Sequence, residues 1–481
     1  MADLLSIAKS GLFVAKKGME TTSHNIANAN TEGFSRQRVN ITTNRPIVKG
    51  GLIEGTGAQI SGIRRIHDPF IMQKLGTDLG NAKYFDEMSN SLAQIEGIFG
   101  DPDSEGITTV LNRFFNSFSE LAGNPEDESI RSYVRDNALR VISDFNRLGG
   151  SMDGATNSIN SGIQIGITDI NSLADQIAKL NRKILIMESS TGDEASDLRD
   201  TRDLSLSKLA EIVNINFYQD NQGMYVVNID GAGTLVAGAI RTEIMARPNR
   251  ETGQFEIYYQ KRPSIPITNK ITKGSLGALV QTRDGGLNKL KEALNTIAFE
   301  VVGRVNQIHQ KGYARRELKT DEKGNPTDVD KKGITSNIPF FKKLSDNKRA
   351  VFNITLSDEV NSDLSNIVTG LLPNRPGDNR VALAISKIPH EKLLNDGQTT
   401  LEEEYLKAIG NIGIAAGRAN FEKEQSDGIL AHTKAMKENM SGVSIDEEAT
   451  QLMRYQSAFQ ASAKVIKEAD EMMDVVLNIM P

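Results

Sequence analysis

The sequence contains no cysteine and no tryptophan, and aromatic residues make up only 5% of its 481 residues. Without cysteine, the chain has no disulfide bonds, no thiolate metal ligands and no cysteine nucleophile. The small number of aromatic side chains favours long helices packed against one another over one thick hydrophobic core. A chain of this length is expected to form about three domains, at ~150 residues each.

Long apolar runs are also absent. No run approaches the ~20 residues that a membrane-spanning helix needs, so we expect no membrane insertion. The first residues contain no apolar core followed by a small-residue cleavage site, so we expect no cleaved secretory signal peptide. The net charge of −6 argues against nucleic acid as a general partner.

The sequence lacks the residue patterns that enzymes and metal proteins use. It has no phosphate-binding Gly-x-x-x-x-Gly-Lys-Ser/Thr loop, and its five histidines form no His-x-x-x-His zinc pair. The stretch that begins at Asp328 resembles the start of a calcium loop, but Lys332 and Pro339 stand where oxygen ligands are needed. We therefore predict no enzyme activity, no cofactor and no metal site. An enzyme or adhesin carried by residues 313–397 is the alternative.

The two ends of the chain carry apolar residues that recur every seven positions. In the N-terminal stretch these are Leu5, Leu12, Met19 and Ile26. In the C-terminal stretch these are Ile445, Leu452, Phe459, Ile466, Met473 and Met480. One apolar residue per heptad makes a narrow helical seam that suits a facing helix. Residues 1–65 carry nine Lys/Arg and four Asp/Glu, whereas residues 441–481 carry three and seven. We therefore expect the ends to pair with each other or with neighbouring copies.

A turn, a strand and a hairpin are predicted after the first seam. Asparagine and glycine residues between 28 and 33 tolerate left-handed backbone angles, which predicts a shaped turn. Residues 39–43 then alternate as in a strand, and the glycines that follow predict a loop and a hairpin leading into a helix. Arg64 and Arg65 are interpreted as the solvated end of a strand.

The middle of the chain is predicted to be mainly α-helical, with a small antiparallel β unit. Residues 71–212 have helical spacing, with separate helices expected at 130–148 and 159–187. Apolar residues alternate within 213–283, which predicts the β unit. A weak strand is expected at 350–356.

These elements predict an elongated fold of discontinuous domains, with the N- and C-terminal helices paired in a coiled-coil-like core. The predicted parts are a terminal helical core at 1–65 and 441–481, a helical body at 66–212, 284–345 and 398–440, a small β unit at 213–283, and a short variable β or irregular segment at 346–397. Within the body, the alternating charges of residues 197–204 are interpreted as ion pairs inside one helix.

Residues 23–34, Ser-His-Asn-Ile-Ala-Asn-Ala-Asn-Thr-Glu-Gly-Phe, resemble the N-terminal signature of bacterial flagellar rod, hook and hook-associated proteins. Three further blocks resemble the hook-associated members of this family: Ser35-Arg36-Gln37, residues 197–204 and residues 441–448. The resemblance implies a structural protein that assembles as a ring between hook and filament and acts as an adaptor between them. A hook or distal rod structural protein is the alternative.

The resemblance also implies partners, a location and an interface. The partners are the hook protein, a second hook–filament junction protein, further copies of the chain in a ring, the flagellar export apparatus and an export chaperone. The location is extracellular, in the bacterial flagellum, and the export apparatus reads an uncleaved N-terminal segment. The implied assembly interface contains Leu5, Leu12, Met19, Ile26, Asn28, Asn30, Gly33, Phe34, Ile445, Leu452, Phe459, Ile466, Met473 and Met480.

Overall fold

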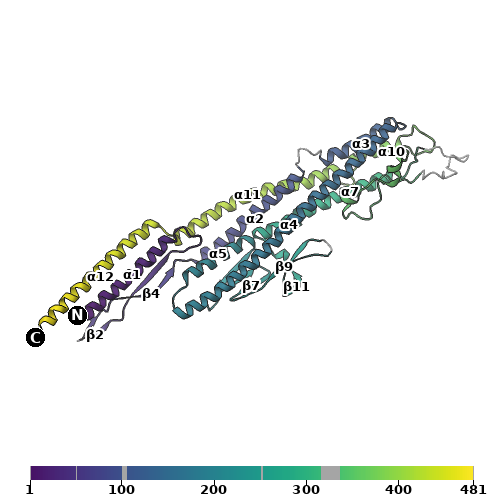
Figure 1. Cartoon of the computed structure of the whole chain (residues 1–481). Helices are drawn as coiled ribbons and strands as arrows, with labels where there is room; N and C mark the ends of the chain where they lie inside the picture. Colours follow the sequence, from purple (N-terminus) through teal and green to yellow (C-terminus); the bar gives the residue numbers. More distant parts are fainter. Residues whose placement is uncertain (1, 50, 100–105, 251–252, 316–335, 480–481) are drawn as a thin grey trace. The chain divides into compact units, whose positions relative to one another are not determined.

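A computed structural model describes residues 2–49, 51–99, 106–250, 253–315 and 336–479 of the chain (Figure 1). Most of these residues are helical, as the sequence predicts. The chain divides into two compact units. The first comprises Met1–Asp86, Ile163–Ala278 and Glu422–Pro481, and the second comprises Glu87–Gly162 and Leu279–Phe421. Both units are therefore assembled from segments that are far apart in the sequence.

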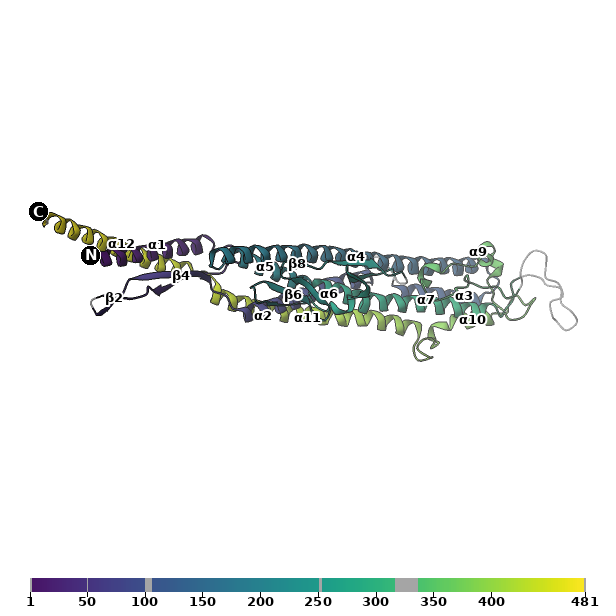
Figure 2. The ribbon, with the colours of Figure 1, turned by 90° about the horizontal axis from the view of Figure 1, so that it is seen from below.

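The first unit contains both terminal helices. Helix α1 (Ala2–Ala27) and helix α12 (Ile445–Ile479) pack against each other. Figures 1 and 2 both show the two helices as neighbours along their lengths. The sequence-based expectation that the two ends lie together is met within a single chain.

An arm of four short strands follows α1 in the first unit. Strands β1 (Gln37–Thr43) and β4 (Ala58–Arg65) pair antiparallel, with a bulge between Asn40 and Ile41. Between them, β2 (Ile47–Lys49) and β3 (Leu52–Glu54) form a hairpin. The strand and the hairpin predicted for this part of the sequence are confirmed.

Two small antiparallel sheets follow helix α5 (Ser196–Ile212) in the first unit. Their strands are β5 (Ile215–Gln219), β6 (Tyr225–Ile229), β7 (Gly233–Ala237), β8 (Ile240–Arg241), β9 (Ile244–Pro248), β10 (Phe255–Tyr259) and β11 (Arg262–Pro266). One sheet has the order β5-β6-β7-β8 and the other β11-β10-β9. Val227, Ile229 and Ile257 are buried on alternating positions, as in strands with one face on a core. The predicted small β unit is confirmed.

Helix α4 (Glu128–Thr191) runs without a break through the region where the sequence predicts two helices. That prediction is wrong. Gly149, between the expected helices, allows close packing in the second unit: a Cβ atom there would lie 2.7 Å from the Phe352 ring and 2.9 Å from Val351. This packing offsets the poor helix propensity of glycine, which is about 1 kcal/mol relative to alanine.

The second unit contains α3 (Ile107–Gly123), α7 (Asn288–His309) and parts of α2 (Pro69–Phe99), α4 and α11 (Leu401–Ser441). Its core includes a cluster of phenylalanines whose ring centroids lie 4.9 to 5.9 Å apart: Phe114, Phe118, Phe340 and Phe341. Rings at these distances attract one another through their edges and faces in addition to their burial.

Residues 346–397 contain short helices joined by irregular segments, and the strand predicted at 350–356 is wrong. The helices are α8 (Ala350–Asn353), α9 (Asp358–Ser362) and α10 (Arg380–Ser386). The backbone N–H of Val351 donates to the side chain of Asn295 at 3.1 Å, so contact with α7 stabilises the helical turn. The division of the whole chain into four predicted parts stays a prediction.

Within the described ranges, the structure contains no helix that is both long and apolar enough to cross a membrane. The described residues also contain no group of three or more His, Asp or Glu side chains placed to hold a metal ion. The calcium-like stretch that begins at Asp328 lies outside the described residues.

Candidate assembly site

Helices α1 and α12 pack antiparallel with closely approaching backbones. Three facing pairs mark the register, and successive pairs are seven residues apart on each helix: Gly11 with Ser462, Gly18 with Tyr455, and Asn25 with Glu448. A Cβ atom at Gly18 would lie 2.5 Å from the Tyr455 ring, so a larger residue would push the helices apart. The closest contacts are therefore made by positions next to the predicted heptad residues: each lies one residue before Leu12, Met19 and Ile26 on α1 and three residues after Ile445, Leu452 and Phe459 on α12.

The residues buried between α1 and α12 are mostly small. They include Ala8, Ala15, Thr22 and Ala469. Most of the larger residues predicted for the seam are half-buried: Leu12, Met19, Ile26, Leu452, Phe459 and Ile466. Leu5, Ile445 and Met473 are 38%, 56% and 41% exposed, and Met480 lies outside the described residues. The larger seam residues thus keep apolar surface that one chain does not cover, and their role as an assembly interface stays a prediction.

The predicted turn after α1 is stabilised by local contacts. The Asn28 side chain donates to the backbone oxygen of His24 at 3.0 Å. Gly33 has a φ of +83°, in the left-handed region that favours glycine. Phe34 is half-buried and packs edge-on against the His24 ring, whereas Asn30 is exposed. The turn redirects the chain from α1 into the arm.

Asn25 connects α1, the arm and α12. Its side chain donates to the backbone oxygen of Gln37 at 2.9 Å and accepts from the backbone N–H of Gln37 at 3.0 Å. The same side chain donates to the Glu448 carboxylate at 3.0 Å. Asn25 is buried, and a buried polar group left without a partner costs about 1–3 kcal/mol. The three segments are therefore coupled through one side chain.

Arg36 joins the arm to the beginning of α12. Its Nε donates to Glu448 and its Nη1 to Glu447, each at 2.6 Å. Its backbone N–H donates to the backbone oxygen of Ser441 at 2.9 Å. Burial by itself lowers the pKa of Arg36, but the hydrogen bonds and charges of Glu447 and Glu448 outweigh burial and raise this pKa. The guanidinium is therefore a permanent positive charge in this contact.

A second ionic cluster joins the arm to α5. Arg65 Nη1 donates to Asp200 and to Asp203, each at 2.7 Å, and Nε lies 3.4 Å from Glu194. Asp200 also accepts from the backbone N–H of Ser35 at 2.8 Å. Burial alone lowers the pKa of Arg65, but the carboxylates of Asp203 and Asp200 raise it above its usual value. The buried cation is therefore matched by carboxylates from another part of the sequence.

Two interpretations made from the sequence are wrong at this cluster. Arg65 is buried and paired, and of the two arginines at the end of β4 only Arg64 is exposed. From the sequence, the acids of residues 197–204 are interpreted as partners of arginines in the same helix. They instead accept hydrogen bonds from residues of the arm, because the turn after α1 brings the arm against α5. Asp197, for example, accepts from the Gln37 side chain at 2.7 Å. The signal in the sequence for the Arg65 contacts was the charge of this residue, which is opposite to that of the acids in residues 197–204.

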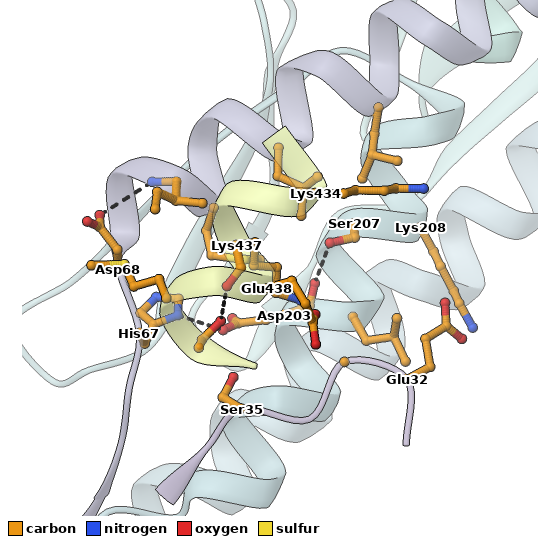
Figure 3. Close-up of a pocket in the computed structure, with 18 of the residues that line it drawn as sticks. Glu32, Ser35, His67, Asp68, Asp203, Ser207, Lys208, Lys434, Lys437 and Glu438 are labelled. Carbon is orange, nitrogen blue, oxygen red and sulfur yellow. Dashed lines mark hydrogen bonds and ion pairs between the residues drawn. The ribbon is translucent and has the colours of Figure 1, made fainter. Parts of the chain in front are cut away.

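A cavity of about 380 Å³ lies beside the Arg65 cluster in the first unit (Figure 3). The turn, the start of α2, α5 and the end of α11 line it. Figure 3 shows charged side chains of both signs around it, including Glu32, Asp203, Lys434 and Lys437. Burial and the positive charge of Arg65 lower the pKa of His67 in this lining. The lining therefore holds a neutral imidazole next to a network of fixed charges.

The site as a whole brings together the turn and arm, α5, and the start of α12. Buried charge-assisted hydrogen bonds fasten the paired terminal helices to the rest of the first unit. These features define a structural assembly protein whose two ends are joined to each other.

Comparison with known proteins identifies the family within this class. Three family descriptions match the chain: "Flagella basal body rod protein" at residues 5–34, "Flagellar hook-associated protein FlgK helical domain" at residues 92–324, and "Flagellar basal body rod FlgEFG protein C-terminal" at residues 438–479. The chain belongs to the FlgK family of flagellar hook-associated proteins, which are structural components of the bacterial flagellum.

Relatives of this family match the chain over its length. Flagellar hook-associated protein 1 of Bacillus subtilis is 27% identical over 517 residues, covering 99% of this chain and 98% of that protein. The protein of the same name from Salmonella typhimurium is 24% identical, with both chains covered completely. The solved structure of the flagellar hook junction protein FlgK from Burkholderia pseudomallei has a TM-score of 0.64 at 16% identity. It covers 77% of this chain and 100% of that one, and shows the same fold.

Proposed function

We propose that this chain is the structural adaptor between the flagellar hook and the filament, and that its copies form a ring at this junction. The observation that carries the proposal is the incomplete burial of the seam between α1 and α12. The small residues are buried when the two helices pair, while the larger heptad residues stay half-buried or exposed. Burying this surface against neighbouring copies is favourable by about 25 cal/mol per Å² of apolar area.

The proposed mechanism is geometric and needs no catalytic residue or cofactor. Terminal helix pairs from neighbouring copies bundle together, and the hook protein and a second junction protein contact the ring from its two sides. The Arg36 and Arg65 clusters give each helix pair a fixed attachment to its own first unit. A fixed attachment lets every copy present the same seam in the same orientation, as a closed ring requires.

We propose that the flagellar export apparatus exports the chain to this position with the help of an export chaperone. The N-terminal segment is not cleaved during export. The support is the match of residues 5–34 to a flagellar family. In this proposal α1 serves first as part of the export address and afterwards as part of the seam.

Labelling of isolated flagella tests the proposed position. An epitope tag inserted at Gly253, in a positive-φ position near the tip of the β9–β10 connection, is detected with gold-conjugated antibody. We expect label in a single band between hook and filament. Label along the hook or on the rod would instead support the hook or rod alternative.

A further inference from the structure

The hairpin β2–β3 exposes four aliphatic side chains. Ile47, Val48, Leu52 and Ile53 are 42%, 75%, 70% and 76% exposed. Val48 pairs with Ile53 across the two strands, so these two lie on one face. A two-stranded hairpin is at best marginally stable in water without a surface to pack on. Both faces of this hairpin therefore carry apolar surface that lacks cover in the single chain.

The base of the hairpin is fixed in place. The backbone N–H of Asn44 donates to the backbone oxygen of Gly57 at 2.9 Å, and the Thr56 hydroxyl donates to the backbone oxygen of Arg45 at 2.8 Å. The backbone N–H of Ala58 donates to Ser10 of α1 at 3.2 Å. The hairpin is therefore presented from a defined position beside α1.

The end of α12 carries a second uncovered surface. The antiparallel register places Ala469, which is buried, opposite the first turn of α1. Residues from Met472 onward therefore run past Ala2, and Figures 1 and 2 both show α12 extending beyond the N-terminal end of α1. Met472, Met473 and Val475 are 49%, 41% and 57% exposed.

The charges around the two surfaces are complementary. The exposed ionic residues of the arm are basic: Arg45 lies next to the hairpin in the connection between β1 and β2, and Arg38 and Arg64 pair at the far end of β1 and β4. The exposed ionic residues towards the end of α12 are mainly acidic: Glu468, Asp470, Glu471 and Asp474 outnumber Lys464 and Lys467, of which Lys467 pairs with Glu471 at 3.5 Å. Opposite charges around apolar centres favour one relative orientation of two partners and disfavour like surfaces meeting.

We propose that the β2–β3 hairpin of one copy packs against the C-terminal end of α12 of the neighbouring copy. Within a single chain neither surface covers the other, because both remain exposed. Each copy offers one hairpin and one helix end, so the contact is head-to-tail and can repeat around a closed ring. This inference rests on the proposed function, and it specifies which surfaces join the copies.

Disulfide crosslinking tests the contact, because the chain has no cysteine of its own. The variants Ile53→Cys and Met473→Cys are produced together in one strain, and isolated flagella are oxidised mildly. We expect a disulfide-linked dimer that contains one chain of each variant, at least fivefold more abundant than in the control pair. The control pairs Ile53→Cys with Thr450→Cys, an exposed position near the opposite end of α12. Incorporation of both variants with no more dimer than the control would overturn the proposal.

A second variant tests the hairpin without relying on a crosslink. Ile53→Asp should reduce incorporation into flagella at least tenfold, while the melting temperature of the monomer stays unchanged because Ile53 is exposed. Asn40→Asp, an exposed position on β1 of the same arm, adds the same charge and should incorporate normally. Normal incorporation of Ile53→Asp would also overturn the contact. Wild-type chain found away from the hook–filament junction would instead refute the proposed function, whatever the crosslinks show.

Discussion

At the scale of residues, a water-shielded ion pair fastens α12 to the arm. The side chains of Arg36 and Glu448 are 10% and 3% exposed, whereas that of Glu447 is 63% exposed. Removing one partner of a buried pair costs about 3–5 kcal/mol, because the other charge stays buried without a partner. An exposed pair contributes about 0–1 kcal/mol. Of the two carboxylates that contact Arg36, Glu448 therefore contributes more to stability than Glu447.

Arg36→Met should lower the free energy of unfolding of the first unit by about 3–5 kcal/mol, since Glu448 then loses its cation. Glu447→Gln is the matched control and should cost no more than about 1 kcal/mol. Urea denaturation of the purified monomer, followed by circular dichroism, measures both values. Equal small losses in the two variants would show that the Arg36–Glu448 pair does not hold α12.

His309 in the second unit is a buried histidine with both ring nitrogens bonded. Nδ1–H donates to the backbone oxygen of Ile338 at 2.7 Å, and Nε2 accepts from the backbone N–H of Val368 at 2.8 Å. Burial, opposed by the Ile338 bond, lowers the pKa of His309 to about 4. The neutral ring is therefore the form that joins these two segments to α7.

The second unit should lose stability as the pH falls from about 6.5 to about 4. The unfolded chain takes up a proton at His309 near pH 6.5, while the folded chain resists it until about pH 4. The stabilisation is complete above pH 6.5, and about 3 kcal/mol of it is lost across this window. His309→Gln retains a donor and an acceptor without titrating, so its urea-unfolding free energy should fall by about 2–3 kcal/mol less than that of wild type between pH 7.5 and 4.5. If the unfolding free energies of wild type and His309→Gln fell equally between pH 7.5 and 4.5, His309 would not be the group that causes the loss of stability.

At the scale of elements, the exposed side of the α1–α12 seam is expected to contact neighbouring copies in the assembled ring. Ile466 is half-buried in the single chain, and Lys464 is exposed. In a ring, a lysine at position 466 would be buried without a partner in every copy, at a cost of several kcal/mol each. In the monomer the same lysine still reaches water.

Ile466→Lys should therefore abolish incorporation while the melting temperature of the monomer barely changes. Cells that produce it should lack filaments and release flagellin into the medium. Lys464→Glu lies off the seam and should assemble. Electron microscopy of the cells shows whether filaments form, and gel analysis of the medium measures the released flagellin, for both variants. Filaments of normal length on the Ile466→Lys cells would mean that this seam does not take part in assembly.

Much at this scale was predictable from the sequence. Heptads at the two ends predicted that the terminal helices have facing partners, and alternation predicted the arm and the small sheets. The direction and register of the terminal pair were not predictable, because they depend on Gly11 and Gly18 and on residues far along the chain. The sequence did not predict that α4 is unbroken at Gly149. Phe352, which packs against this glycine in the helix, is about two hundred positions away in the sequence. The contacts of Arg65 were missed for the same reason, since a local pattern cannot show partners on α5.

At the scale of the whole molecule, the apolar core is unevenly distributed. Among the described side chains of α1 and α12, the buried apolar ones are Ala8, Val14, Ala15 and Ala469. Such small residues supply little of the hydrophobic stabilisation that orders a segment. The terminal pair therefore depends on the polar contacts at its base and on neighbours in the assembly.

Limited proteolysis of the isolated monomer should first cut the parts of α1 and α12 that lie beyond their polar contacts with the arm at Asn25, Arg36 and Glu448. The same ends should resist protease in isolated flagella, where neighbouring copies cover them. Mass spectrometry of the fragments locates the cuts. Equal protection of ends and body in the monomer would show that the helix pair is already fully stable alone.

The central claim is that joined terminal helices build a ring between hook and filament. A density map of the isolated hook–filament junction tests it most directly. The account predicts one ring of this chain at the junction, with α1 and α12 of each copy paired antiparallel and their half-buried heptad residues packed against neighbouring copies. A map in which this chain is absent from the junction, or in which Leu12, Phe459 and Ile466 face solvent in the assembled ring, would contradict the account.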